Sequence, residues 1–200
     1  DADGDGDLDL AVTNGDWPYI TCCFPGAPAE PTSRNALYLN NGSGVFQLAD
    51  AGDLDDTTQN SQVLAAFDAD GDGDIDLAVG NGQRTYSGGV DRNQFFLNDG
   101  NGRFTLTVNE PFTNFFNTTV MAAFDADGDG DKDLVSRTDH GSARLTLLFN
   151  NGLGQFVQGA SGDLWRSEPL FTGTLVPIDV DGDGDMDLAV DNDRPVWGNP

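Results

Sequence analysis

The sequence is poor in basic residues, and it contains no long apolar run. Nine lysines and arginines stand against 34 acidic residues, which gives a net charge of −25. Four bound divalent cations would still leave about −17, so the chain should repel nucleic acid and anionic membranes. We therefore predict no nucleic-acid partner. Because no stretch of about 18 apolar residues is present, we also predict no membrane span in this segment.

Cysteine and histidine are also scarce. The two cysteines, Cys22 and Cys23, are adjacent, and the sequence leaves open whether they are reduced, joined to each other or paired with another chain. The single histidine, His140, stands in the run DHGSAR, which could supply a base and an anion clamp of the kind that a polysaccharide lyase uses. No second cluster of catalytic residues accompanies it. We predict that the protein has no catalytic residues and is not an enzyme, with a lyase as the alternative.

Aspartate, by contrast, is concentrated in a nine-residue phrase that occurs four times. The copies are DADGDGDLD at Asp1–Asp9, DADGDGDID at Asp68–Asp76, DADGDGDKD at Asp125–Asp133 and DVDGDGDMD at Asp179–Asp187. Five aspartates on alternate residues repel one another unless a cation holds them together. A calcium ion takes six to eight oxygen ligands, whereas Mg²⁺ prefers a strict octahedron and keeps its waters. We therefore predict about four Ca²⁺ ions; the alternative is an acidic, solvated turn without metal.

Each position of the phrase has a predicted role in calcium binding. Positions 1, 3 and 5 supply side-chain oxygens, position 7 supplies its backbone carbonyl, position 9 supplies a further carboxylate, and the glycine at position 6 allows a sharp turn. An EF-hand needs glutamate at position 12 and a following helix, but here valine or serine occupies position 12 within a short apolar run typical of a strand. The predicted ligands are Asp1, Asp3, Asp5, Asp7, Asp9, Asp68, Asp70, Asp72, Asp74, Asp76, Asp125, Asp127, Asp129, Asp131, Asp133, Asp179, Asp181, Asp183, Asp185 and Asp187.

A second recurring phrase lies between the acidic loops. It joins an apolar run to an aromatic-led run through Asn, Asp and Gly, which predicts a β-hairpin. A further apolar stretch precedes each of the last three loops. The hairpins are Asn35–Phe46, Asn93–Phe104 and Leu145–Phe156, and the apolar stretches are Val63–Phe67, Val120–Phe124 and Leu175–Ile178. One period therefore holds four strands, which is typical of a blade of a β-propeller; a linear β-solenoid is the alternative.

The DxDGDGxxDL loop followed by the LNNGxGxF hairpin resembles the FG-GAP/VCBS repeat of integrin-α-like β-propellers. The resemblance covers essentially the whole chain, with four loops and three hairpins in register. It implies an extracellular seven-bladed propeller with calcium in the loop between the first and second strands of each blade.

The blade count is lower than the resemblance implies. The sequence predicts 13 strands, divided into a partial blade at 1–61 that lacks its first strand, blades at 62–117 and 118–173, and a partial blade at 174–200. Three to four blades fall short of the number in most closed rings. We expect the chain to be a segment of a larger propeller, or to close with another copy of itself into a ring or filament.

The predicted function is an extracellular or cell-surface scaffold for adhesion or for binding a protein or carbohydrate ligand. Variable loops on a rigid scaffold are usual sites of recognition, and exposed aromatic side chains can stack on sugars or anchor a partner. The predicted ligand-binding residues are Trp17, Tyr19 and Trp165, although these rings could instead pack within their own loops. The alternatives are a subunit of a head-to-tail fibre and a propeller-fold polysaccharide lyase. Glycosylation of Asn41 and Asn117 is left open.

Overall fold

The computed structural model describes residues 1–15, 34–56, 59–82, 91–139, 143–159 and 173–191. Within these ranges the fold is almost entirely β. The strands are β1 Leu10–Val12, β2 Ala36–Asn40, β3 Phe46–Leu48, β4 Ser61–Phe67, β5 Asp76–Asn81, β6 Gln94–Asn98, β7 Phe104–Thr107, β8 Thr118–Phe124, β9 Asp133–Asp139, β10 Ala143–Asn150, β11 Phe156–Gln158, β12 Leu175–Ile178 and β13 Asp187–Val190. Two short helical elements accompany them, α1 at Asp53–Asp56 and the 3₁₀ turn η1 at Phe112–Asn114.

The strands form four antiparallel sheets in chain order. The first sheet has the order β1-β2-β3, the second β4-β5-β6-β7, the third β8-β9-β10-β11, and the fourth pairs β12 with β13. Each sheet is a meander in which consecutive strands are neighbours, and the first sheet lacks the strand that precedes the acidic loop in the other three. The prediction of an all-β fold built from blade-like antiparallel sheets is confirmed. A closed ring is not seen among the described residues.

The hairpins lie where the Asn/Gly phrases predict them. The strand pairs β2–β3, β6–β7 and β10–β11 are antiparallel, and in each the asparagine that ends the first strand stands opposite the phenylalanine that begins the second. The residue after that asparagine closes the turn through its backbone N–H, at 3.1–3.2 Å from the carbonyl four residues on. Two glycines in each turn have positive φ, for example Gly100 at 73° and Gly102 at 76°, a region that side chains disfavour.

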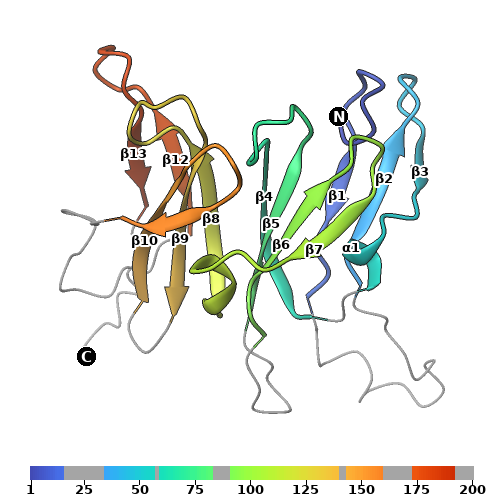
Figure 1. The fold of residues 1–200 in the computed structure, drawn as a ribbon, viewed down its shortest axis with the longest axis horizontal. Helices are drawn as coiled ribbons and strands as arrows, with labels where there is room; N and C mark the ends of the chain where they lie inside the picture. Colours follow the sequence, from blue (N-terminus) through green and yellow to red (C-terminus); the bar gives the residue numbers. More distant parts are fainter. Residues whose placement is uncertain (16–33, 57–58, 83–90, 140–142, 160–172, 192–200) are drawn as a thin grey trace, which may run out of the picture.

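The four sheets stand side by side, and their facing sides form the cores (Figure 1). Between the second and third sheets lies a cluster of phenylalanines in edge-to-face contact, with the rings of Phe95 and Phe156 centred 5.7 Å apart. Smaller clusters join the first sheet to the second and the third to the fourth. The expected small residues of the first strands are also present, with Ala65 of β4 opposite Ala78 of β5. The repeat therefore buries its apolar residues only by stacking on neighbouring repeats.

The first strand of each complete sheet lies at the sheet edge. Both β4 and β8 pair on one side only. In the described part of the chain, β12 also pairs with a single strand, and it contains Pro177. Proline cannot donate a ladder hydrogen bond, so its position on an edge strand agrees with the prediction.

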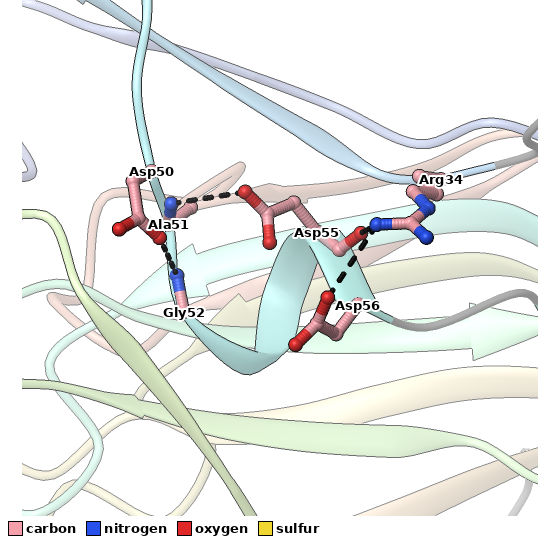
Figure 2. A network of polar contacts seen from close by, with 6 residues as sticks. All are labelled: Arg34, Asp50, Ala51, Gly52, Asp55 and Asp56. Atoms are coloured by element: carbon pink, nitrogen blue, oxygen red, sulfur yellow. Dashed lines mark hydrogen bonds and ion pairs between the residues drawn. The ribbon is translucent and has the colours of Figure 1, made fainter.

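A short acidic helix connects the first sheet to the second, and the sequence analysis did not predict it. Figure 2 shows its contacts: Asp55 accepts a hydrogen bond from the backbone N–H of Ala51 at 3.2 Å, and Arg34 donates to the backbone carbonyl of Asp55 at 3.3 Å. The Arg34 guanidinium also lies 3.4 Å from the carboxylate of Asp56. Leu54 points inward and is buried. The helix is thus held by a buried leucine and by polar contacts that include a hydrogen bond from the backbone N–H of Leu106 in β7 to Asp53 at 2.8 Å.

The outer faces of the two end sheets expose apolar side chains. Leu10 and Val12 of the first sheet are 49% and 38% exposed, whereas their counterparts Leu77 and Val79 of the second sheet are 2% and 0% exposed. On the fourth sheet, Val176 and Ile178 are also exposed. These faces correspond to the ones that are covered by a neighbouring sheet inside the stack.

Candidate metal centres

The four acidic loops lie along the same edge of the row of sheets, at the top of Figure 1. We number them in chain order: loop 1 is Asp1–Asp9, loop 2 is Asp68–Asp76, loop 3 is Asp125–Asp133 and loop 4 is Asp179–Asp187. Loops 2, 3 and 4 connect the first and second strands of their sheets, and loop 1 leads into β1. The predicted position between two strands is therefore correct for loops 2, 3 and 4.

Each loop brings three carboxylates together. In loops 2, 3 and 4 the three are at positions 1, 3 and 9, and in loop 1 they are at positions 1, 3 and 5. In every group one oxygen atom of each carboxylate lies within 4.8 Å of one oxygen of the other two. The groups are Asp1, Asp3 and Asp5; Asp68, Asp70 and Asp76; Asp125, Asp127 and Asp133; and Asp179, Asp181 and Asp187.

Backbone N–H groups hold the carboxylates of the loop in place. In loop 2, the carboxylate of Asp68 accepts hydrogen bonds from Gly71 at 2.8 Å and Gly73 at 3.1 Å. Asp72 accepts one from the backbone of Asp74 at 2.9 Å. Loops 3 and 4 repeat these bonds within a few tenths of an ångström. Gly73 has a φ of 96°, which explains the glycine at position 6. The phrase therefore encodes one loop conformation, because each aspartate fixes the turn that follows it.

The aspartate at position 9 has a second role that the sequence analysis did not predict. One oxygen of Asp76 accepts the backbone N–H of Ala69 at 3.0 Å, and the other accepts the backbone N–H of Asn98 at 2.9 Å. Loop 1 and loop 3 have the same pair of bonds, from Ala2 and Asn40 to Asp9 and from Ala126 and Asn150 to Asp133. This carboxylate therefore ties the loop to the strand that leads into the hairpin of its sheet. The sequence carries no signal for this role, because the donors are backbone N–H groups that any residue except proline supplies.

The aspartate at position 7 points away from the carboxylate group. Its side chain lies against the first glycine of the hairpin turn in the same sheet, so that a Cβ added at Gly42, Gly100 or Gly152 would collide with Asp7, Asp74 or Asp131. This arrangement agrees with the expectation that position 7 offers its backbone carbonyl and not its side chain. The positive φ of these glycines is the stronger reason that glycine occupies that place in each hairpin.

Burial changes the electrostatics of the inner loops. Asp76 is 1% exposed, and its burial raises its pKa to about 6, with the charges of Asp70 and Asp72 adding to the effect and its two backbone hydrogen bonds opposing it. Burial also raises the pKa of Asp133, which is 0% exposed, and that of Asp70. A buried carboxylate among other carboxylates holds its proton more tightly, because burial removes the water that stabilises its charge and the neighbouring negative charges repel it.

The donor set fits a hard divalent cation. Every candidate ligand is an oxygen, and three carboxylates converge in each loop. The loop contains no nitrogen or sulfur ligand that would favour zinc or copper.

Several predicted residues lie outside the described part of the chain. These are the candidate ligand-binding residues Trp17, Tyr19 and Trp165, together with Cys22, Cys23 and His140. Of the two asparagines left open for glycosylation, Asn41 begins a hairpin turn and Asn117 has a positive φ of 55°. Among the described residues, no helix is long and apolar enough to cross a membrane.

The sheets and their acidic loops define a class of repeat protein in which each antiparallel blade carries one loop of this kind. Comparison with protein families matches the FG-GAP-like repeat at residues 1–79, 85–136 and 125–190. The chain therefore belongs to the FG-GAP-like repeat family.

One similar solved structure is that of a lectin from Agrocybe aegerita. That lectin is described as specifically recognising non-reducing terminal N-acetylglucosamine. It is 22% identical, with a TM-score of 0.43, and the match covers 68% of this chain and 36% of that one. The chain thus spans about a third of the length of that protein. A comparison with curated proteins gave no match.

Proposed function

We propose that the protein is a calcium-stabilised scaffold of the β-propeller type that works outside the cell and binds a protein or carbohydrate ligand. The single observation that carries the proposal is the convergence of three carboxylates in each of the four loops. Membership of the FG-GAP-like repeat family supports it, since such repeats often bind calcium and are typical of extracellular proteins. Millimolar calcium outside cells suits exposed loops of modest affinity.

The role of calcium in this proposal is structural. The ion neutralises carboxylates that otherwise repel one another. In loops 2, 3 and 4 the converging carboxylates come from both ends of the connection between the first and second strands. In loop 2, for example, Asp68 directly follows β4 and Asp76 begins β5. A cation held by both would fix the first strand to the second. The proposed function is binding, and no catalytic residue is assigned.

Isothermal titration calorimetry on the metal-free protein tests the calcium proposal. We expect about four Ca²⁺ per chain and much weaker binding of Mg²⁺, which dehydrates reluctantly and demands octahedral geometry. Asp70→Asn should remove one site and leave three. A chain that binds no calcium, or that binds the same amount after the substitution, would contradict the proposed ligands.

The ligand can be sought with immobilised glycans and extracellular proteins. We expect binding in calcium that is lost in chelator, and lost in the Trp17→Ala and Trp165→Ala variants if the predicted aromatic residues carry it. Trp197→Ala is the matched control, because it removes an aromatic ring that was not assigned to the ligand.

Self-assembly is a second candidate function, and the exposed end faces favour it. The apolar residues Leu10 and Val12 at one end and Val176 and Ile178 at the other occupy faces whose counterparts are covered inside the stack. Copies that join head to tail would cover both faces in the same way and form a ring or filament. Light scattering at increasing concentration tests this, and a monodisperse monomer at high concentration would exclude it.

A further inference from the structure

One asparagine of the second sheet touches two acidic loops at once. The backbone N–H of Asn98 donates to Asp76 of loop 2, as described above, while its side-chain Nδ2 donates to the backbone carbonyl of Ala2 in loop 1 at 2.9 Å. Ala2 lies between Asp1 and Asp3, two of the carboxylates that converge in loop 1. A displacement of Asn98 therefore moves Asp76, a candidate ligand in loop 2. It also moves the backbone between two candidate ligands of loop 1.

The third sheet repeats this connection one step along the stack. The backbone N–H of Asn150 donates to Asp133 of loop 3 at 2.8 Å, and its Nδ2 donates to the carbonyl of Ala69 in loop 2, also at 2.8 Å. The same carbonyl accepts the backbone N–H of Gly154 at 2.8 Å, so two groups of the third sheet hold it. Ala69 lies between the candidate ligands Asp68 and Asp70.

Together these bonds form an unbroken path through loop 2. The carbonyl of Ala69 is held by the third sheet, its N–H is held by Asp76, and Asp76 is bonded to Asn98, which holds loop 1. Asn98, Asn150 and Asp76 are all buried. Buried hydrogen bonds are protected from water, so a change in one member is transmitted to the next and not absorbed by solvent.

We propose that Asn98 and Asn150 are positioning residues that couple calcium binding in loops 1, 2 and 3. A calcium ion bound in one loop fixes the aspartate at position 9 of that loop. This aspartate fixes the asparagine that is hydrogen-bonded to it. The asparagine then holds the backbone between two ligands of the preceding loop. Calcium binding to these three loops is therefore positively cooperative. The inference rests on the proposed calcium function and adds a route between sites.

A double-mutant cycle in the 200-residue protein tests the coupling by calorimetry. Asp70→Asn disables loop 2 and should weaken the affinity of loops 1 and 3 for Ca²⁺ by about fivefold or more, the lower end of measured coupling between linked sites. In an Asn98→Leu, Asn150→Leu background, the same substitution should leave the affinity of those loops unchanged. Equal weakening in both backgrounds, or none in either, would overturn the coupling.

Asn40 provides the matched control. It occupies the same place in the first sheet, but its Nδ2 donates to the carbonyl of Leu8 in the loop of its own sheet, at 3.2 Å. Asn40→Leu should therefore leave the effect of Asp70→Asn at its wild-type size. Loss of the effect in this variant as well would show that the asparagines act only through general stability.

A second measurement needs no asparagine substitution and remains informative if the leucine variants do not fold. The backbone N–H of Gly6 donates to Asp1 in loop 1, so its hydrogen exchange reports the order of that loop. At a subsaturating calcium concentration, Asp70→Asn should speed exchange at Gly6 although loop 1 is unaltered; unchanged exchange would overturn the coupling. A complete absence of calcium binding would instead overturn the proposed function itself.

Discussion

The two inner loops and the two outer loops have nearly the same sequence but different surroundings. Asp76 and Asp133, at position 9 of loops 2 and 3, are buried, whereas Asp9 is half-buried and Asp187 is exposed at the same position of loops 1 and 4. In all four loops the aspartate at position 9 nevertheless accepts a hydrogen bond from the backbone N–H of position 2. The phrase therefore determines the conformation of the loop, and the neighbouring sheets determine how strongly its charges are buried.

The apolar residues show the same difference, and this leads to the largest expected effect. Phe46 and Phe156 hold the same place after their hairpin turns, but Phe46 is 47% exposed and Phe156 is 5% exposed, in contact with the rings of Phe67 and Phe95. We expect Phe156→Ala to lower the free energy of unfolding by about 3–5 kcal/mol. Phe46→Ala should cost much less. Urea denaturation of both variants in saturating calcium measures the difference, and equal costs would contradict the observed packing.

A matched pair of aspartates gives the next largest effect. Asp76→Asn removes a metal ligand and also a buried acceptor of a backbone N–H, whereas Asp187→Asn removes an equivalent ligand whose backbone bond is exposed. A buried donor left without its acceptor costs about 1–3 kcal/mol. We expect Asp76→Asn to be the more destabilising in calcium by about that amount. Thermal unfolding of the two variants in calcium measures the difference. Equal melting temperatures would contradict the expectation that burial makes the inner-loop aspartate more important for stability.

The pH dependence of the metal-free protein is expected to be smaller but to have a definite sign. Burial raises the pKa of Asp76 from 3.8 to about 6, so between these values the folded state binds more protons than the unfolded state. In chelator, stability should therefore be highest below pH 3.8 and fall as the pH rises through about 6. In calcium the trend should reverse, because the cation requires ionised carboxylates.

Chemical denaturation in chelator across this range measures the trend. Asp76→Asn is the control, since it removes the titrating group and should flatten the fall; the outer-loop variant Asp187→Asn should leave it in place. A fall of the same size in Asp76→Asn would assign the pH dependence to other carboxylates.

Much of this architecture could be predicted because it is repeated. The regular spacing of the acidic phrase and of the hairpin predicted four sheets, their antiparallel order and the position of the loops, and Leu175–Ile178 was predicted with its observed bounds. The helix α1 could not be predicted, because four residues of the run DLDD carry no helical periodicity and form a turn only through Arg34 and the neighbouring sheet. The double role of Asp76 depends on backbone N–H groups, which any residue could supply, and the bridging role of Asn98 depends on a contact between sheets. A repeat pattern does not reveal such contacts.

Thermal unfolding in calcium and in chelator tests the central claim most directly. A ligand at a hundred times its Kd stabilises the folded state by about 2.7 kcal/mol per site, so four sites would contribute about 10 kcal/mol, comparable to the stability of a whole domain. We predict that chelator lowers the melting temperature sharply and that added calcium restores it, with Mg²⁺ much less effective. An unchanged melting temperature in chelator would contradict the claim that calcium holds the four loops together.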